Sequence, residues 1–171
     1  MVSKLTDLLY LSNLDISKIE TDGVSKKIYS QIMTLKAMGY KVSYIFKKDK
    51  LIYIVNDSNV QKKLTIDKGN FRKNIYLITK LISRNRSNTY QYIYIRKSLS
   101  TFNVIRSYKI LSKLGKVILE IPVFPYKGEK NKGFISLVGY YMDSYLNKLF
   151  LNKYVNLIVN YNGYNERKQR K

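Results

Sequence analysis

Short apolar runs alternate with longer amphipathic stretches along this chain of 171 residues. The first run, at residues 6–13, has a continuous apolar middle closed by polar residues, which is typical of a buried strand. Apolar residues then recur at spacings of three and four, at Val24, Ile28, Ile32, Leu35 and Met38. This spacing predicts one apolar face of a helix, and Gly39 follows at the position where helices commonly end.

The alternation continues to about residue 160. Further strands are predicted at 41–46, 51–55, 92–96, 117–121 and 155–159, with a short strand around 64–66. Helices are predicted at 70–83, from Val104 to the glycine at 115, and around Val138, Met142, Tyr145 and Leu149. Strands that alternate with helices of about a dozen residues are typical of βαβ units. We therefore expect an α/β fold with a doubly wound, mostly parallel sheet.

The loop at residues 21–27, TDGVSKK, joins the first strand to its helix. Backbone amides at a helix N-terminus and the helix dipole both favour negative charge. Gly23, Val24 and Ser25 are therefore candidate phosphate-binding residues, and Asp22 is a candidate cap of the helix. The alternative is an ordinary loop that precedes a helix.

The composition removes several classes of chemistry. The chain contains no cysteine and no histidine, which excludes disulfides, thiolate nucleophiles and imidazole bases and removes the commonest metal ligands. We therefore expect no metal site. No N-terminal signal pattern is present, and no apolar run approaches the ~20 residues that cross a bilayer. We expect a cytoplasmic protein.

The charge is strongly positive. Lysine and arginine number 32 against 11 acidic residues, a formal charge of +21. Such a charge attracts nucleic acid, anionic lipid head groups or other polyanions. A solvated surface is the alternative, because Lys, Ile, Asn and Tyr are abundant together, as an A/T-rich coding sequence would produce, and the lysines are scattered along the chain. Both interpretations stay open.

Four segments of the chain form a set: residues 21–27 (TDGVSKK), 38–42 (MGYKV), 92–96 (YIYIR) and 117–126 (VILEIPVFPY). Together they resemble the N-terminal domain of GT-B glycosyltransferases of the family-four (group 1) type. The resemblance covers the chain to about residue 160 and implies a Rossmann-like domain of a bacterial enzyme of capsule, exopolysaccharide or other glycan synthesis.

The resemblance also implies which substrate each domain binds. In GT-B enzymes the N-terminal domain takes the acceptor, and a second domain takes most of the nucleotide-sugar. We expect residues 1–160 to be the acceptor-side domain and 161–171 a charged tail, with the second domain missing, either because the gene product is truncated or because the enzyme is split into two subunits. A nucleotide-sugar is expected only with that missing half, and no other cofactor is expected. The expected partners are a glycan or lipid-linked acceptor and a separate C-terminal-half subunit.

One departure from the family bears on activity. Many relatives carry a His-Asp step after the strand that ends at Ile121, where this chain has Pro122 and Val123. The paired glutamates of the donor site are also missing. The resemblance therefore implies that the isolated chain lacks full transferase activity.

Three residues are candidates for the acceptor site. Glu120 is the candidate catalytic residue, because it is next to the expected crevice and is suited to orient a sugar hydroxyl or to act as a base; the alternative is a carboxylate that accepts backbone hydrogen bonds. Arg96 is suited to bind phosphate or an acidic sugar, with a structural ion pair as the alternative. Tyr126 is suited to stack on a sugar, although with 17 tyrosines in the chain simple packing competes.

A membrane surface is a further expected partner. Lys148 and Lys153 flank a predicted helix with an apolar side that includes Leu146 and Phe150, which suits attachment to the inner face of an anionic membrane. A core-facing stripe with solvated lysines is the alternative.

Two other functions remain open. A basic nucleic-acid-binding protein fits the charge and the abundant tyrosine, but no known binding motif occurs, so nucleic acid is the less favoured partner. A gene remnant that folds and binds nothing is the third possibility.

Overall fold

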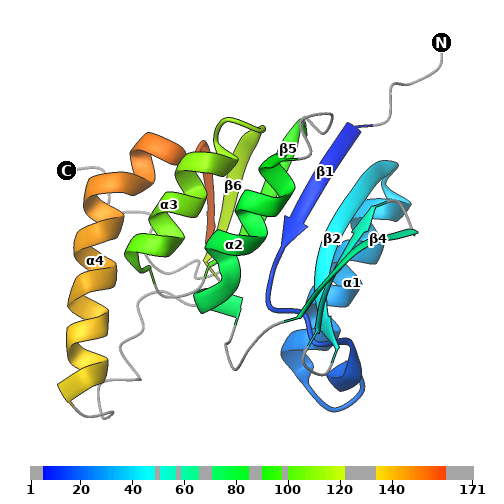
Figure 1. Ribbon diagram of the computed structural model, residues 1–171, viewed down its shortest axis with the longest axis horizontal. Coiled ribbons are helices and arrows are strands. Elements are labelled where there is room, and N and C mark those ends of the chain that lie inside the picture. The colour runs from blue at the N-terminus through cyan, green and yellow to red at the C-terminus, as the bar shows by residue number, and fades with distance from the viewer. Residues whose placement is uncertain are drawn as a thin grey trace.

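The computed structural model describes residues 6–48, 51–56, 59–65, 71–84, 90–97, 100–121 and 134–160. These residues form an α/β unit (Figure 1). The strands are β1 (Thr6–Leu11), β2 (Tyr40–Lys48), β3 (Leu51–Asn56), β4 (Asn59–Thr65), β5 (Tyr92–Arg96), β6 (Lys116–Ile121) and β7 (Leu157–Asn160). The helices are α1 (Gly23–Ala37), α2 (Phe71–Arg84), α3 (Phe102–Leu111) and α4 (Phe134–Tyr154), with a short 3-10 helix η1 (Ile16–Lys18).

The seven strands form one sheet in the order β4-β3-β2-β1-β5-β6-β7. Five of them, β2, β1, β5, β6 and β7, run parallel. The strands β3 and β4 are antiparallel and extend the sheet beyond β2. The expected mostly parallel α/β sheet is therefore confirmed, with an antiparallel edge.

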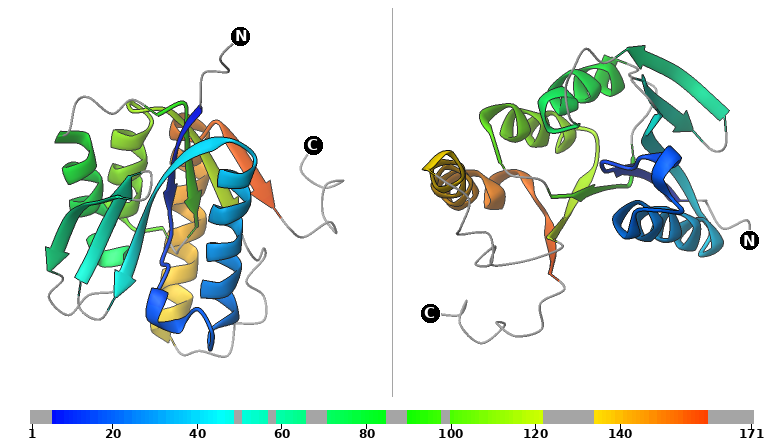
Figure 2. Two further views of the ribbon diagram at one scale, coloured as in Figure 1. Left: turned by 90° about the vertical axis from the view of Figure 1, so that its right-hand side faces the viewer. Right: turned by 90° about the horizontal axis from the view of Figure 1, so that it is seen from below.

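Helices cover both faces of the sheet (Figure 2). Of the described α-helices, α1 lies on one face, and α2, α3 and α4 lie on the other. Two apolar clusters follow this division. One joins α1 to β1 and β2 through residues such as Ile28, Ile32 and Val42, and the other joins the remaining helices to the sheet through residues such as Ile78, Leu111 and Leu146.

The predicted helix at residues 24–38 matches α1 closely, but its ends do not pack as expected. Ile28 and Ile32 are buried, whereas Val24 is 51% exposed and Met38 is 66% exposed. Val24 lies in the first turn and Met38 at the C-cap, so neither reaches the strands that the middle of the helix covers. Gly39 ends the helix with a φ of 88°, a conformation that glycine adopts without the strain of a Cβ.

The side of α4 that faces the core also differs from the prediction. The residues that marked this helix in the sequence include Val138, Tyr145 and Leu149, and these are 51%, 64% and 50% exposed. Leu146 and Leu151 are buried instead. The alternative interpretation of Leu146, a core-facing position, is therefore confirmed. Among the helices that the structure describes, none combines the length and apolar character needed to cross a bilayer.

Candidate functional site

The strand order of the sheet reverses at β1. The strand β2 lies on one side of β1 and β5 on the other, so successive parallel strands are added first outward on one side and then on the other. In open α/β sheets ligands bind at the carboxyl ends of the strands at such a switch point. A ligand site is therefore expected at the carboxyl ends of β1, β5 and β6.

Three polar side chains lie in one row at these ends, on the face that α1 covers beside β1. Leu11 of β1 pairs with Ile95 of β5, so the residues that follow them, Ser12 and Arg96, lie side by side. Arg96 pairs in turn with Glu120 of β6. Ser12, Arg96 and Glu120 thus come from segments spread over more than a hundred residues, and only the strand order brings them together.

Arg96 and Glu120 form an ion pair across the two strands. The distance from Arg96 Nη1 to Glu120 Oε1 is 2.8 Å, and the side chains are 12% and 0% exposed. The structural ion pair considered for Arg96 is present, and its partner is the other predicted site residue. The remaining guanidinium N–H groups lie on a side chain that keeps some contact with solvent.

Two buried acceptors in this row lack partners among the described residues. They are Oε2 of Glu120 and Oγ of Ser12, and the residues are 0% and 2% exposed. An unsatisfied buried polar group costs about 1–3 kcal/mol, so native proteins keep few of them. The open Oε2 of Glu120 beside the Arg96 guanidinium, together with the open hydroxyl of Ser12, marks this row, which we call the carboxyl-edge row, as the candidate site.

Two tyrosines support the carboxyl-edge row from one step earlier in the strands. Tyr10 and Tyr94 pair in the β1–β5 register, and their rings stack with centroids 5.0 Å apart. Tyr10 also donates from its hydroxyl to Oε1 of Gln31 on α1 at 2.8 Å. Tyr94 was not among the predicted site residues, although the alternation Tyr92, Tyr94, Arg96 along β5 already indicated that the three share a face.

The predicted phosphate-binding residues lie together at the N-terminus of α1, on the same edge of the sheet. The amides of Val24 and Ser25 are engaged by the chain itself. The Asp22 carboxylate accepts from Val24 N at 3.3 Å and from Ser25 N at 3.0 Å, and Ser25 Oγ donates to it at 2.7 Å. Asp22 is therefore the helix cap that the sequence predicted. A phosphate that bound these amides would have to displace this carboxylate.

These contacts also affect the acidity of Asp22. The Ser25 hydroxyl, followed by the amides of Ser25 and Val24, holds the pKa of the Asp22 carboxyl below its ordinary value of 3.8. The aspartate is thus a firmly ionised occupant of the helix N-terminus at neutral pH. Of the other predicted positions, Tyr126, Pro122 and Val123 lie outside the residues that the structure describes.

A second polar cluster, missed in the sequence, lies on the opposite face just after β5. Lys97 Nζ donates to both carboxylate oxygens of Asp143 on α4, at 3.0 Å and 2.8 Å. Ser100 N also donates to Asp143 at 2.6 Å, and Asn147 Nδ2 does so at 3.0 Å. The side chains of Lys97 and Asp143 are 1% and 7% exposed. This cluster ties the segment that follows Arg96 to α4 and so helps to position Arg96.

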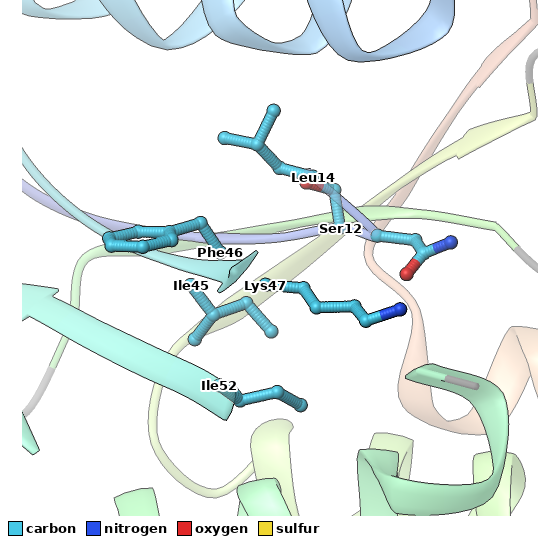
Figure 3. A pocket seen from close by; sticks show the side chains of 7 residues that line it. Ser12, Leu14, Ile45, Phe46, Lys47 and Ile52 are labelled. Carbon is cyan, nitrogen blue, oxygen red and sulfur yellow. The ribbon is translucent and has the colours of Figure 1, made fainter. Parts of the chain in front are cut away.

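A small hollow lies at the carboxyl ends of β1 and β2 (Figure 3). Its empty volume is about 220 Å³ including open solvent, and Ser12, Lys47 and Ile52 are among its lining residues. Figure 3 shows Leu14 pointing toward α1, whereas Lys47 and Ile52 lie on the other side of the strands. Ser12 is the member of the carboxyl-edge row that lines this hollow, and the Lys47 side chain lies on the side of the strands that faces away from α1. Within the described part of the chain, no cluster of three acidic residues suitable for a metal ion occurs.

A scan against models of protein families and a search of curated proteins each found no match to this chain. The glycosyltransferase resemblance therefore remains a prediction.

Proposed function

We propose that this chain is the acceptor-side unit of a GT-B-type glycosyltransferase of glycan synthesis, which works with a separate unit that holds the nucleotide-sugar. The observation that carries this proposal is the open Oε2 of Glu120 beside the Arg96 guanidinium, at the switch point of a mostly parallel sheet. A ligand hydroxyl group that donates a hydrogen bond to Oε2 would give this buried acceptor a partner. The Rossmann-like arrangement supports the proposal at the level of the fold.

The chemistry of the carboxyl-edge row selects the class of ligand. Arginine binds carboxylate and phosphate groups through several N–H donors, and Glu120 accepts from hydroxyl groups. A sugar that carries an acidic or phosphate group offers both partners at once. In this proposal Glu120 orients the attacking hydroxyl of the acceptor and Arg96 holds its negative group.

The test measures the binding of a series of ligands to the purified chain, by calorimetry or by ligand-observed NMR. The probes are an oligosaccharide that contains glucuronic acid, a short-chain polyprenyl-phosphate sugar, a neutral oligosaccharide and a nucleotide-sugar. We expect the acidic or phosphate-linked sugars to bind at least about tenfold more tightly than the neutral one, since charge-assisted hydrogen bonds are the stronger ones.

Variants locate the binding. Glu120→Gln keeps the shape of the side chain but removes its charge, and we expect it to weaken acceptor binding about tenfold or more. Lys116→Gln, on the exposed start of the same strand, is the matched control and should bind normally. Equal binding by the wild type and by a folded Glu120→Gln would overturn the assignment of the site, and turnover of a nucleotide-sugar by the chain alone would overturn the division into two units.

The net charge of +21 supports a second candidate, a nucleic-acid-binding protein. Binding through phosphates weakens steeply as salt rises, because counterions are released. Tight, steeply salt-dependent retention on DNA, unaffected by the acidic sugar, would favour this second function. Weak retention that the sugar abolishes would favour the first.

A further inference from the structure

The outward side of α4 carries a row of large apolar side chains at helical spacing. Val138, Tyr141, Tyr145 and Leu149 follow one another at spacings of three, four and four and are 51%, 64%, 64% and 50% exposed. We call these four residues the α4 stripe. At about 100° per residue they fall within a narrow sector of the helix. Asp143, Leu146 and Leu151, on the other side, are buried.

Cationic side chains border the α4 stripe. Lys148 and Lys153 are both exposed, and at about 100° per residue they fall on opposite flanks of the stripe. The single acidic residue of α4, Asp143, is buried and bonded to Lys97. Among the described side chains of α4, the exposed face is therefore apolar from Val138 to Leu149, with Asn152 in the same sector one turn later; it carries a lysine on each flank and no carboxylate.

We propose that the α4 stripe docks this chain on the surface of an anionic lipid bilayer. Tyrosine rings suit the boundary between head groups and acyl chains, because they are apolar with one polar end. Lysines beside an apolar stripe pair with anionic head groups while their stems cover apolar surface. The charge of +21 adds long-range attraction to such a surface and opposes contact with a second copy of the chain.

The position of α4 in the fold decides which part of the protein would meet the membrane. The helix α4 lies at one end of the row of helices that also contains α2 and α3, whereas α1 is on the opposite face of the sheet (Figure 2). Docking through α4 would therefore leave α1 away from the membrane. The docking proposal does not depend on the acceptor proposal, since it uses none of the carboxyl-edge residues.

The first test is flotation with lipid vesicles, either phosphatidylcholine alone or phosphatidylcholine mixed with phosphatidylglycerol. We expect the wild type to float only with the phosphatidylglycerol vesicles. The double variant Tyr145→Ser/Leu149→Ser should weaken this binding at least about tenfold, because it removes apolar side chains that enter the interface. Met33→Ser/Met38→Ser, which changes exposed apolar residues on α1, should bind like the wild type.

Charge variants separate local from global attraction. Lys148→Glu/Lys153→Glu and Lys18→Glu/Lys26→Glu change the net charge equally, but only the first pair borders the α4 stripe. We expect the α4 pair to bind at least about tenfold more weakly than its control, since each lysine near the surface contributes about 1 kcal/mol. Equal loss in the two pairs would show attraction by net charge alone and would overturn docking through α4.

A fluorescent probe reports contact directly, because the chain contains no tryptophan. Tyr145→Trp should shift its emission to the blue when phosphatidylglycerol vesicles are added, and Met38→Trp should not. An unchanged spectrum of Tyr145→Trp would overturn the proposal. So would a wild-type dimer in solution that Tyr145→Ser/Leu149→Ser abolishes, because a second copy would then cover the stripe.

Discussion

Arg96 Nη1 lies 2.8 Å from Oε1 of Glu120, and the two residues face each other across the parallel strands β5 and β6. The carboxylate is fully buried, and its second oxygen has no partner among the described residues. A buried ion pair of this kind adds little to the stability of a fold, because the cost of desolvating the two charged groups offsets much of their attraction. In the proposed function, a ligand hydroxyl that donates to Oε2 completes this pair.

The ion pair predicts a strongly non-additive double-mutant cycle. Glu120→Leu leaves the Arg96 charge without its partner and should lower the free energy of unfolding by about 3 kcal/mol. Adding Arg96→Met to Glu120→Leu should recover much of this loss, because no unpaired charge remains. Urea unfolding at neutral pH gives the free energy of unfolding of the wild type, of each single variant and of the double variant. Additive losses would contradict the coupling.

Loss of the carboxylate in the Lys97–Asp143 cluster is predicted to lower the free energy of unfolding at least as much as loss of Glu120, and to loosen the described residues that follow β5. Asp143→Asn should destabilise the fold by about 3–5 kcal/mol, since it removes the charge of the carboxylate that contacts the buried Lys97 ammonium. The amide of Ser100, which donates to Asp143 at 2.6 Å, should exchange with solvent faster. Hydrogen exchange and urea unfolding measure both effects. Ser144→Ala, at the exposed neighbouring position, is the control and should change neither.

Asp22 predicts a pH dependence of stability. Its pKa in the folded state is below the ordinary value of 3.8, so its contribution is complete above about pH 3.8 and is lost as the pH falls through the lower folded-state pKa. Asp22→Asn keeps a capping side chain that does not titrate. The advantage of the wild type over this variant should therefore shrink in acid, as measured by urea unfolding from neutral pH downward. An advantage that grows in acid would contradict the assignment.

Asp22 also controls the predicted anion site. If Gly23, Val24 and Ser25 bind phosphate, then Asp22→Ala should strengthen inorganic phosphate binding, because it frees the amides of Val24 and Ser25. Asp15→Ala removes an equal charge from the cap of η1 and is the matched control. Calorimetry with phosphate distinguishes the two. Equal affinity in both variants would remove the case for a phosphate site at this helix.

Two glycines are expected to differ in how strongly their substitution by alanine changes the stability of the fold. A Cβ at Gly115 would collide with the backbone oxygen of Tyr90, so Gly115→Ala should destabilise the fold by about 2 kcal/mol or more. A Cβ at Gly23 meets nothing within 4 Å, and Gly23→Ala should change the stability by less than about 0.5 kcal/mol. Thermal unfolding measures both. Equal effects would contradict the close approach at Gly115.

The element types were predictable because each depends on local periodicity. The alternation at Ile93 and Ile95 and the spacing of Ile28 and Ile32 identify a strand and a helix without any distant contact. The side of α4 that packs inward was not predictable in this way. Apolar residues surround much of that helix, so its orientation depends on a partner, and the partner of Asp143 is Lys97, 46 residues earlier.

The sequence by itself determined the alternation of strands and helices, the α/β class, the capping of α1 by Asp22 and the exclusion of thiol and imidazole chemistry. Each of these follows from residue type or from spacing within a few turns of chain. The tertiary structure decided that Ser12, Arg96 and Glu120 form one row, and that Val138, Tyr141, Tyr145 and Leu149 remain exposed. Those outcomes depend on strand order and register, which are set by the packing of segments far apart in the chain.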